Sequence, residues 1–326
     1  MTTFSASGVG AGSYYVRVRA ISASGAISGP SNEALLIVSG VGCTNPGAPT
    51  GLAIVSITGG TVVLAWTAAT GGPTSYVIEA GSAPGLANLA NSDLGSPTPA
   101  LTATGVGPGT YYVRVRARNG CGTSGASNEI IVMIGISGTL TVDARANIFG
   151  AGHATLAPVV GGAGVLPPGV TFPPADGQAL RFSSVTGVVS PENSGLFFNG
   201  PDGGIYRGNI GTNVTALAGI GGIIHLNTNM FLVGVFLDNT EPTDPAPGSL
   251  FFSSPENFTT LAVQLRQTFF IGDGRTTTGG VTQQFFVPAG ATRLFLGFAD
   301  SDRFQGSPSY YNDNLGSLTV TFSIGP

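Results

Sequence analysis

Charged residues are scarce in this 326-residue chain, and lysine is absent. All twelve basic residues are arginines, charged residues make up 9 % of the sequence, and the formal net charge at pH 7 is -4. Binding to DNA or RNA relies on clustered Lys and Arg side chains that neutralise phosphates. A chain with so few basic residues therefore offers no electrostatic footprint for nucleic acid.

Long apolar runs are missing too. None approaches the ~20 residues that a membrane-spanning helix needs, so we expect no membrane span. Residues 1–8 have neither the basic start nor the apolar core of a signal peptide. The internal repeat described below indicates that residue 1 is not the natural start of the protein. We therefore expect the signal peptide to lie upstream and the protein to be extracellular or on the cell surface.

Motifs of enzymes are also lacking. The two histidines, His153 and His225, have no nucleophile motif around them, and no Gly-x-Ser-x-Gly sequence occurs. The carboxylates form no obvious pair of the glycosidase kind. His225 ends an apolar strand-like run, where a packed structural histidine is favoured over a ligand. The sequence thus predicts a protein that is not an enzyme.

Glycine, proline and short apolar runs dominate what is present. Gly and Pro number 52 and 22, and hydrophobic residues make up 42 % of the chain. The apolar residues alternate in short runs between turn residues, which is typical of strands in an all-β protein. A helical pattern is confined to residues 254–265. At this length we expect two or three domains.

A repeat of nearly one hundred residues organises the first part of the chain. Residues 8–20 recur as residues 105–117, so the Tyr-Tyr-Val-Arg-Val-Arg run that begins at Tyr14 returns at Tyr111. This period is too long for a solenoid and matches tandem β-sandwich domains.

The second copy, residues 46–135, resembles a complete fibronectin type III domain. Its early strand carries Val62, Leu64 and Trp66 on one face, where alternate residues of a strand point. Tyr111 stands where such a sandwich has its corner tyrosine. The resemblance implies two packed antiparallel sheets.

The first copy, residues 1–39, corresponds to the C-terminal half of the same domain. It keeps only the last three strands and lacks those that would supply the tryptophan and the opposite half of the core. Three strands of a sandwich cannot bury their inner face alone. We therefore expect a fragment of a longer chain, whose incomplete sandwich is protease-sensitive or self-associates through exposed strand edges.

The two cysteines lie at opposite ends of the complete domain. Cys43 precedes it, and Cys121 follows the strand that begins near Tyr111. An even number of cysteines in a secreted-looking β-protein suits an oxidising compartment, and the two positions can be bridged across the edge of a sandwich. We favour a disulfide over two buried free thiols. Zinc is not expected, because no paired Cys or His accompanies them.

Residues 137–326 form a further all-β domain, for which a jelly roll of about eight strands is expected. Its strand-like runs are residues 180–182, 223–226, 230–237, 267–271, 283–287, 291–298 and 318–322.

An oxygen-rich loop, residues 299–317, lies between the last two of these runs. It carries Asp300, Asp313 and Asn314. Their side-chain oxygens suit Ca2+, which takes six to eight oxygen ligands at ~2.4 Å, and the two flanking strands hold the loop at both ends. The alternative is an Asx-rich hairpin loop whose side chains bond only their own backbone.

Residues 287–300 and 310–320 together resemble the last two strands of the LecA-type galactophilic bacterial lectins. In that family an Asp closes the first strand, and a pair of Asn followed by x-Gly-Ser opens the second. Asp300 matches the Asp, and Asp313-Asn314 matches the pair with one amide replaced by a carboxylate. The resemblance implies a calcium site in a galactose-binding-like β-sandwich.

The resemblance implies two further calcium ligands, both backbone carbonyls. One lies three residues before the Asn pair and falls on Tyr310. The other comes from an early strand that ends in an aromatic residue and Gly. Residues 141–150 are similar to that strand, so the carbonyl of Phe149 is the fifth expected ligand.

The sugar contacts of the family are matched only in part. Its His-x-x-Gln pair has no counterpart in the corresponding residues 218–226. Its Gly-Pro-x-Gly turn near the sugar is matched by residues 200–203, which makes Asp202 a candidate for the rim of a ligand pocket. Because the family's ion holds two neighbouring sugar hydroxyls, the resemblance implies a galactoside-type partner, bound with altered specificity by the three side chains that hold the ion.

These inferences favour an extracellular bacterial binding or adhesion protein, in which fibronectin-type domains form a spacer and the terminal domain binds calcium and a carbohydrate. A structural alternative is a surface or filament subunit with calcium-stiffened loops. In a third hypothesis the chain is the accessory region of a glycan-degrading enzyme. A glycan array in calcium and in chelator separates the first two, and the upstream gene sequence decides the third.

Overall fold

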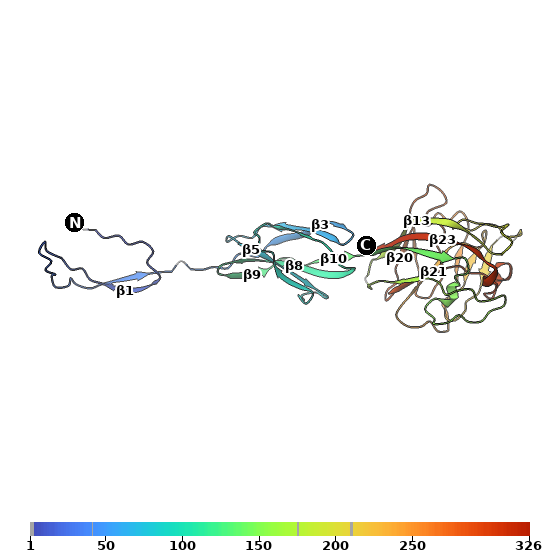
Figure 1. Ribbon diagram of the computed structural model, residues 1–326, viewed down its shortest axis with the longest axis horizontal. Helices are drawn as coiled ribbons and strands as arrows, with labels where there is room; N and C mark the ends of the chain where they lie inside the picture. Colours follow the sequence, from blue (N-terminus) through green and yellow to red (C-terminus); the bar gives the residue numbers. More distant parts are fainter. Residues whose placement is uncertain (1–2, 41, 175, 209–210) are drawn as a thin grey trace.

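The computed structural model describes residues 3–40, 42–174, 176–208 and 211–326, and Figure 1 shows three units in succession along its long axis. Within these residues there is no α-helix, only the short 3-10 turns η1 (Ile148–Gly150), η2 (Asp302–Phe304) and η3 (Tyr311–Asp313). The all-β prediction is confirmed. None of the described residues forms a helix long and apolar enough to cross a membrane.

The first unit is one antiparallel pair, β1 (Gly12–Val16) with β2 (Ala34–Val38). Every described residue of this unit is exposed except Val38, which is half-buried. Three strands were expected, but the third is reduced to a single bridge between Ile21 and Ile27. No second sheet covers the pair among the described residues, so its apolar side chains stay in solvent.

The middle unit is a sandwich of two sheets. The strands of one are β3 (Thr50–Thr58), β4 (Thr61–Thr67) and β7 (Ala100–Ala103), in that order. The other has the order β10-β8-β5-β6, with β9 paired to β8; its strands are β5 (Ser75–Gly81), β6 (Ala90–Asp93), β8 (Gly109–Asn119), β9 (Gly122–Ala126) and β10 (Ile130–Ile134).

The core of the middle unit lies between these sheets. Val62, Leu64 and Trp66 are buried on β4, as their alternation predicted. The Trp66 ring meets the ring of Tyr76 edge-on, with centroids 5.2 Å apart. The Tyr111 hydroxyl donates to the carbonyl oxygen of Gly107 at 2.8 Å and so fixes the corner before β8.

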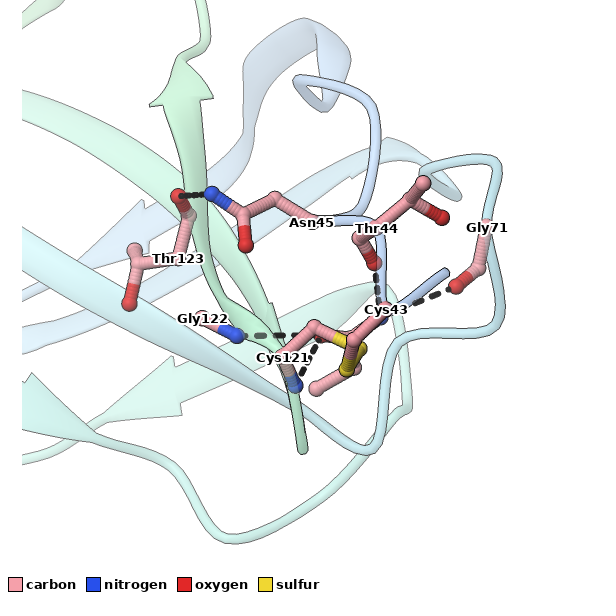
Figure 2. Close-up of a disulfide and its surroundings, with 8 residues drawn as sticks. Cys43, Thr44, Asn45, Gly71, Cys121, Gly122 and Thr123 are labelled. Atoms are coloured by element: carbon pink, nitrogen blue, oxygen red, sulfur yellow. Dashed lines mark hydrogen bonds between the residues drawn. A yellow bond between two sulfur atoms is a disulfide. The ribbon is translucent and has the colours of Figure 1, made fainter. Parts of the chain in front are cut away.

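A disulfide joins Cys43 to Cys121, as predicted, and Figure 2 shows it at one end of the middle unit. The segment after Cys43 is held in addition by hydrogen bonds. Asn45 donates to the carbonyl of Thr123 at 3.3 Å, and Asn119 donates to the carbonyl of Thr44 at 3.0 Å. The cross-link closes a loop with a sequence separation of 78 residues, a size for which cross-linking contributes about 2–5 kcal/mol.

The third unit contains three sheets with the orders β11-β23-β13-β20-β18, β12-β21-β16-β19 and β17-β15-β14-β22. The strands are β11 (Ile136–Asp143), β12 (Gly169–Thr171), β13 (Ala179–Ser190), β14 (Thr212–Val214), β15 (Ile223–His225), β16 (Val233–Leu237), β17 (Leu250–Phe252), β18 (Thr260–Ala262), β19 (Phe269–Phe270), β20 (Gln284–Phe286), β21 (Arg293–Gly297), β22 (Gln305–Gly306) and β23 (Leu315–Gly325).

Phenylalanines fill the core of the third unit, among them Phe182, Phe236, Phe269, Phe285 and Phe322. Each strand-like run of the sequence contributes to one of its strands. The helix expected over residues 254–265 is wrong, since this segment supplies β18, which pairs in parallel with β20. Pairing with a strand more than twenty residues away overrides the local helical pattern.

The pairing register of β23 shows where the oxygen-rich loop, residues 299–317, lies in the third unit. Ile324, near its end, pairs with Ile136 beside the junction with the middle unit, and Figure 1 marks the C-terminus at that junction. At the start of β23, Leu315 pairs with Ser190 and Ser317 with Asp143. An eleven-residue strand spans about 36 Å, so the loop before β23 lies at the far end of the third unit.

Candidate metal centre and its cavity

A cavity of about 490 Å3 opens at this far end, and we call it the distal cavity. Its walls come from the end of β13, the loop after β21, the loop before β23 and the segment after residues 200–203. The lining residues are Pro191, Tyr206, Arg207, Asp300, Ser301, Asp302, Arg303, Phe304, Tyr310 and Asp313.

Asp300 lies at the floor of the distal cavity and is 2 % exposed. The strand β21 ends three residues earlier, and its continuation is fixed by backbone hydrogen bonds between Phe298 and the segment that contains Ala146. The Asp300 Oδ1 atom accepts from the backbone N–H of Ser301 at 2.8 Å, and Oδ2 accepts from Asn314 Nδ2 at 2.9 Å. The carboxylate is thus held rigidly between two loops.

Asn314 is fixed in one orientation. Its Nδ2 atom donates to Asp300 and also to the carbonyl oxygen of Ala144 at 3.2 Å. Two acceptors on the same side define which end of the amide carries the nitrogen. The Oδ1 atom therefore points away from both, and it is buried without a hydrogen-bond partner among the described residues.

Two residues that line the cavity also carry a buried oxygen without a hydrogen-bond partner among the described residues: Oδ1 of Asp313 and Oγ of Ser301. Leaving a buried polar atom unsatisfied costs about 1–3 kcal/mol. A cluster of such atoms around one carboxylate is therefore a feature that needs an occupant or another explanation.

The electrostatics of the cluster point the same way. Burial raises the pKa of Asp300 to about 8, and the nearby Asp313 charge adds to the shift. Burial also raises the pKa of Asp313, with a contribution from Glu192. Two acidic groups whose charged forms are disfavoured gain from a nearby cation.

Tyr310, the predicted donor of a backbone carbonyl, lies on the cavity wall. Its backbone is left-handed, with φ 64°, and its N–H donates to the carbonyl of Val160 at 2.8 Å. A non-glycine residue adopts this conformation at a cost of order 1–2 kcal/mol, so the surrounding turn must impose it. The side chain is 39 % exposed.

Phe149 is not among the residues that line the distal cavity. Its strand, β11, ends at Asp143, and Phe149 sits in the turn η1 with its ring in the core. The cavity wall is completed instead by Pro191, directly after β13. The aromatic-Gly signal was local, whereas the pairing of Ser190 with Leu315 that brings Pro191 here joins distant parts of the chain.

Asp202 also lies away from this cavity. It belongs to the turn at residues 200–203, and its Oδ1 accepts from the backbone N–H of Asp273 at 2.7 Å. Burial raises its pKa, as do the charges of Asp273 and Glu256. The structure therefore groups Asp202 with these two residues, not with Asp300.

Clusters of three or more His, Cys, Asp and Glu side chains in a metal-binding arrangement are absent from the described residues. The candidate centre is of another composition: two carboxylates, one amide and backbone carbonyls. Such a set of hard oxygen donors favours Ca2+ over metals that prefer nitrogen or sulfur.

The second wall of the cavity contains residues that the sequence analysis did not single out. Tyr206 donates its hydroxyl to Glu192 Oε2 at 2.8 Å, and Arg207 pairs with the same carboxylate oxygen. Hydrogen bonds from Ser194, Tyr206 and Arg207 hold the pKa of Glu192 below its usual range. Residues 218–226, which correspond to the part of the lectin family that contacts the sugar, do not line the cavity.

His225 is packed, as expected, between the rings of Phe231, Phe252 and Phe270. Its Nδ1 accepts from the backbone N–H of Asn227 at 3.3 Å. Its Nε2 lies 2.8 Å from Glu256 Oε1, although the ring is not aligned for a hydrogen bond. Burial lowers the pKa of His225, so the ring is held neutral.

Comparisons with known proteins concern the middle unit. A family model for the fibronectin type III domain matches residues 47–133. The chain is similar to the titin kinase with its flanking domains (25 % identity, TM-score 0.23), to a Fn3-like protein from Clostridium thermocellum (26 %, 0.24) and to the twitchin kinase region of C. elegans (30 %, 0.24). No curated protein matches the chain.

Each of these three matches covers 28 % of this chain. The matched region is 95 % of the Clostridium protein but only 17 % of the titin and twitchin chains, far less than two thirds of their length. The middle unit is a fibronectin type III domain, as Trp66 and Tyr111 predicted.

Proposed function

We propose that the distal cavity binds a calcium ion and, through it, a carbohydrate, in an extracellular or cell-surface protein whose fibronectin type III domain serves as a spacer. The disulfide supports an oxidising compartment. Cell-surface proteins commonly use sandwich domains of this kind. The proposal assigns binding to the chain and no catalytic step.

The observation that carries the proposal is the set of buried oxygens without partners. Asp313 Oδ1, Asn314 Oδ1 and Ser301 Oγ lack hydrogen bonds among the described residues, beside a carboxylate with a raised pKa. A calcium ion satisfies such atoms and neutralises the charge that burial disfavours.

The ligand set we assign combines side chains and carbonyls. Asp300, Asp313 and Asn314 supply side-chain oxygens, and the carbonyls of Tyr310 and Pro191 complete the protein's share. We include Pro191 because it lines the cavity, whereas Phe149, the carbonyl expected from the sequence, does not. Five protein ligands leave one to three of calcium's usual six to eight positions open.

The open positions suit a sugar. In the lectin family that this loop resembles, the ion holds two neighbouring hydroxyls directly. The cavity volume of about 490 Å3 falls in the range of small-ligand sites. Tyr310, 39 % exposed on the wall, offers an aromatic surface for the apolar face of a sugar ring.

A purely structural role is the second candidate. The apolar residues of β1 and β2 are exposed, including Tyr15, Leu35 and Ile37. Exposed edges and faces of this kind favour pairing with another chain. In that case calcium only stiffens the loops of the third unit.

The test is a glycan array and a calorimetric titration, each performed in calcium and in chelator. We expect binding with a Kd on the order of 10⁻⁴ to 10⁻³ M, because one ion and few side chains carry it. Chelator and Asp313→Ala should both abolish the signal. A calcium-loaded protein that binds no glycan on the array, or an ion whose coordination is filled by protein, would favour the structural role.

A further inference from the structure

The second wall of the distal cavity carries a guanidinium group in a fixed position. Arg207 packs its guanidinium over the ring of Tyr206, 5.4 Å from the ring centre. It also pairs with Glu192, a buried carboxylate. Yet 62 % of the Arg207 side-chain surface stays accessible.

The partners of Arg207 are themselves fixed. Glu192 accepts hydrogen bonds from the hydroxyls of Ser194 and Tyr206. The Tyr206 ring is held edge-on between Phe197 and Phe304, at 5.3 Å and 6.0 Å between centroids. An arginine that is stacked and paired in this way loses little further freedom when a ligand binds it.

The two walls enclose one cavity: Asp300, Tyr310 and Asp313 line it together with Tyr206 and Arg207. A ligand held at the calcium ligands in this cavity therefore faces the wall that carries Arg207. Burial and Glu192 together raise the Tyr206 pKa to about 12, so its hydroxyl remains a neutral donor.

The charges of the cavity balance in pairs. A calcium ion offsets Asp300 and Asp313, and Arg207 offsets Glu192. Arg303, which makes contacts of its own, lines the same cavity together with Asp302. A neutral sugar would offer Arg207 only hydroxyl oxygens. A carboxylate or sulfate on the sugar would form a contact with Arg207 in which both partners are charged and which can be bidentate, and this is the stronger contact.

We propose that the distal cavity is selective for anionic saccharides, with sugar hydroxyls on the calcium ion and a carboxylate or sulfate on Arg207. This inference rests on the proposed function and specifies its ligand class. Arg207 is then a specificity-determining residue, and Glu192 and Tyr206 position it.

The experiment measures affinity calorimetrically for three probes: methyl galactoside, galacturonate and galactose 6-sulfate. Free calcium is held at one activity throughout, because uronates themselves chelate calcium. We expect one or both anionic probes to bind about tenfold more tightly than the neutral one, equivalent to about 1.4 kcal/mol. The preference should shrink as salt is raised, since the cavity is open to solvent.

The variant Arg207→Gln should reduce the ratio of anionic to neutral affinity to about one, and Arg207→Lys should restore part of it. The calcium-induced rise in Tm reports whether each variant is folded. Which anionic probe binds more tightly distinguishes carboxylate from sulfate recognition.

Equal or weaker binding of both anionic probes would overturn the inference and leave the calcium and sugar proposal standing. A preference for anionic probes that persists in a folded Arg207→Gln protein would show that Arg207 does not determine the specificity. Calcium binding without binding of any probe overturns the inference and the carbohydrate role together. Failure to bind calcium at all overturns the proposed function itself.

Discussion

Two buried carboxylates in the third unit have opposite surroundings. Glu256 is fully provided with partners: Oε1 accepts from Ser254 at 2.5 Å, Oε2 accepts from Thr277 at 2.9 Å, and the His225 ring lies beside it. Although burial acts to raise its pKa, these groups hold the pKa of Glu256 below its usual range. This carboxylate is charged, and its two oxygens accept hydrogen bonds from the protein without a bound ligand.

Asp300 is more deeply buried, at 2 % exposed against 8 % for Glu256, and it lies beside atoms that lack partners among the described residues. Oδ1 of Asp313 and of Asn314 are two of them. The pKa of Asp300 is raised to about 8. A buried carboxylate whose two oxygens both accept hydrogen bonds stabilises the fold, whereas a carboxylate with a disfavoured charge beside unpartnered oxygens is typical of a binding site. The comparison favours a structural role for Glu256 and supports the binding role that we propose for Asp300.

The largest loss of stability should come from a substitution of Glu256. Glu256→Ala leaves the hydroxyls of Ser254 and Thr277 without their charged acceptor, and each hydrogen bond to a charged group contributes about 1.5–3 kcal/mol. Urea unfolding of the third unit should show this loss. The calcium-induced stabilisation should persist.

The control is Glu241→Ala, which removes the exposed partner of His153. Surface pairs contribute about 0–1 kcal/mol, so this variant should unfold almost like the parent protein. A Glu256→Ala protein that is as stable as the control would contradict a structural role for Glu256. Loss of its calcium response would mean that Glu256 also contributes to calcium binding.

The next effect concerns the unsatisfied cluster. Calcium at one hundred times its Kd should stabilise the protein by about 2.7 kcal/mol, because it binds only the folded state. Asp313→Ala should abolish this gain, as should Asp300→Ala. Thermal unfolding in calcium and in chelator measures it. A calcium response that remains in both variants would remove these carboxylates from the site.

The stability of the protein should also depend on pH through the raised pKa of Asp300. The pKa of Asp300 is raised from its ordinary 3.8 to about 8, so between these values the folded state keeps a proton that the unfolded state has lost. Without calcium, stability should therefore fall as pH rises through this window, by up to about 1.4 kcal/mol per pH unit.

Calcium replaces that proton, so its stabilising effect should be larger at pH 8 than at pH 6. Tm values at pH 6, 7 and 8, in calcium and in chelator, test this directly. Asp300→Asn should flatten the profile recorded in chelator. A parent protein whose stability in chelator rises over this range would contradict the buried, protonated Asp300.

The smallest effect is expected at Asp202. Asp202→Asn keeps the Oδ1 atom that accepts from Asp273, so the change in stability should stay within about 0.5 kcal/mol. The calcium response should be that of the parent protein. A weakened response would place the turn at residues 200–203 in the calcium site after all.

The sequence predicted those features that depend on local pattern. Alternation identified Val62, Leu64 and Trp66 as core, because successive strand residues point to opposite faces. The short loop between two apolar runs brought Asp300 close to Asp313 and Asn314 by chain connectivity alone. Both inferences needed only a few neighbouring residues.

Features that depend on distant pairing were missed. Pro191 reaches the cavity because β13 pairs along its whole length with β23, and nothing near Pro191 signals this. Tyr206 and Arg207 arrive through contacts with Glu192 and Phe304. An arginine beside a Gly-Pro-Asp-Gly turn was the only available signal. The prediction for Phe149 rested on a local aromatic-Gly motif, and the structure does not place this residue among those that line the cavity.

The most direct test of the central claim is a crystal structure of the chain grown in millimolar calcium, with the ion identified by its anomalous scattering. We expect one ion at about 2.4 Å from oxygens of Asp300, Asp313, Asn314, Tyr310 and Pro191, with at least one water-filled position facing the distal cavity. A site that contains only water, or an Asn314 Oδ1 satisfied by the protein itself, would contradict the account.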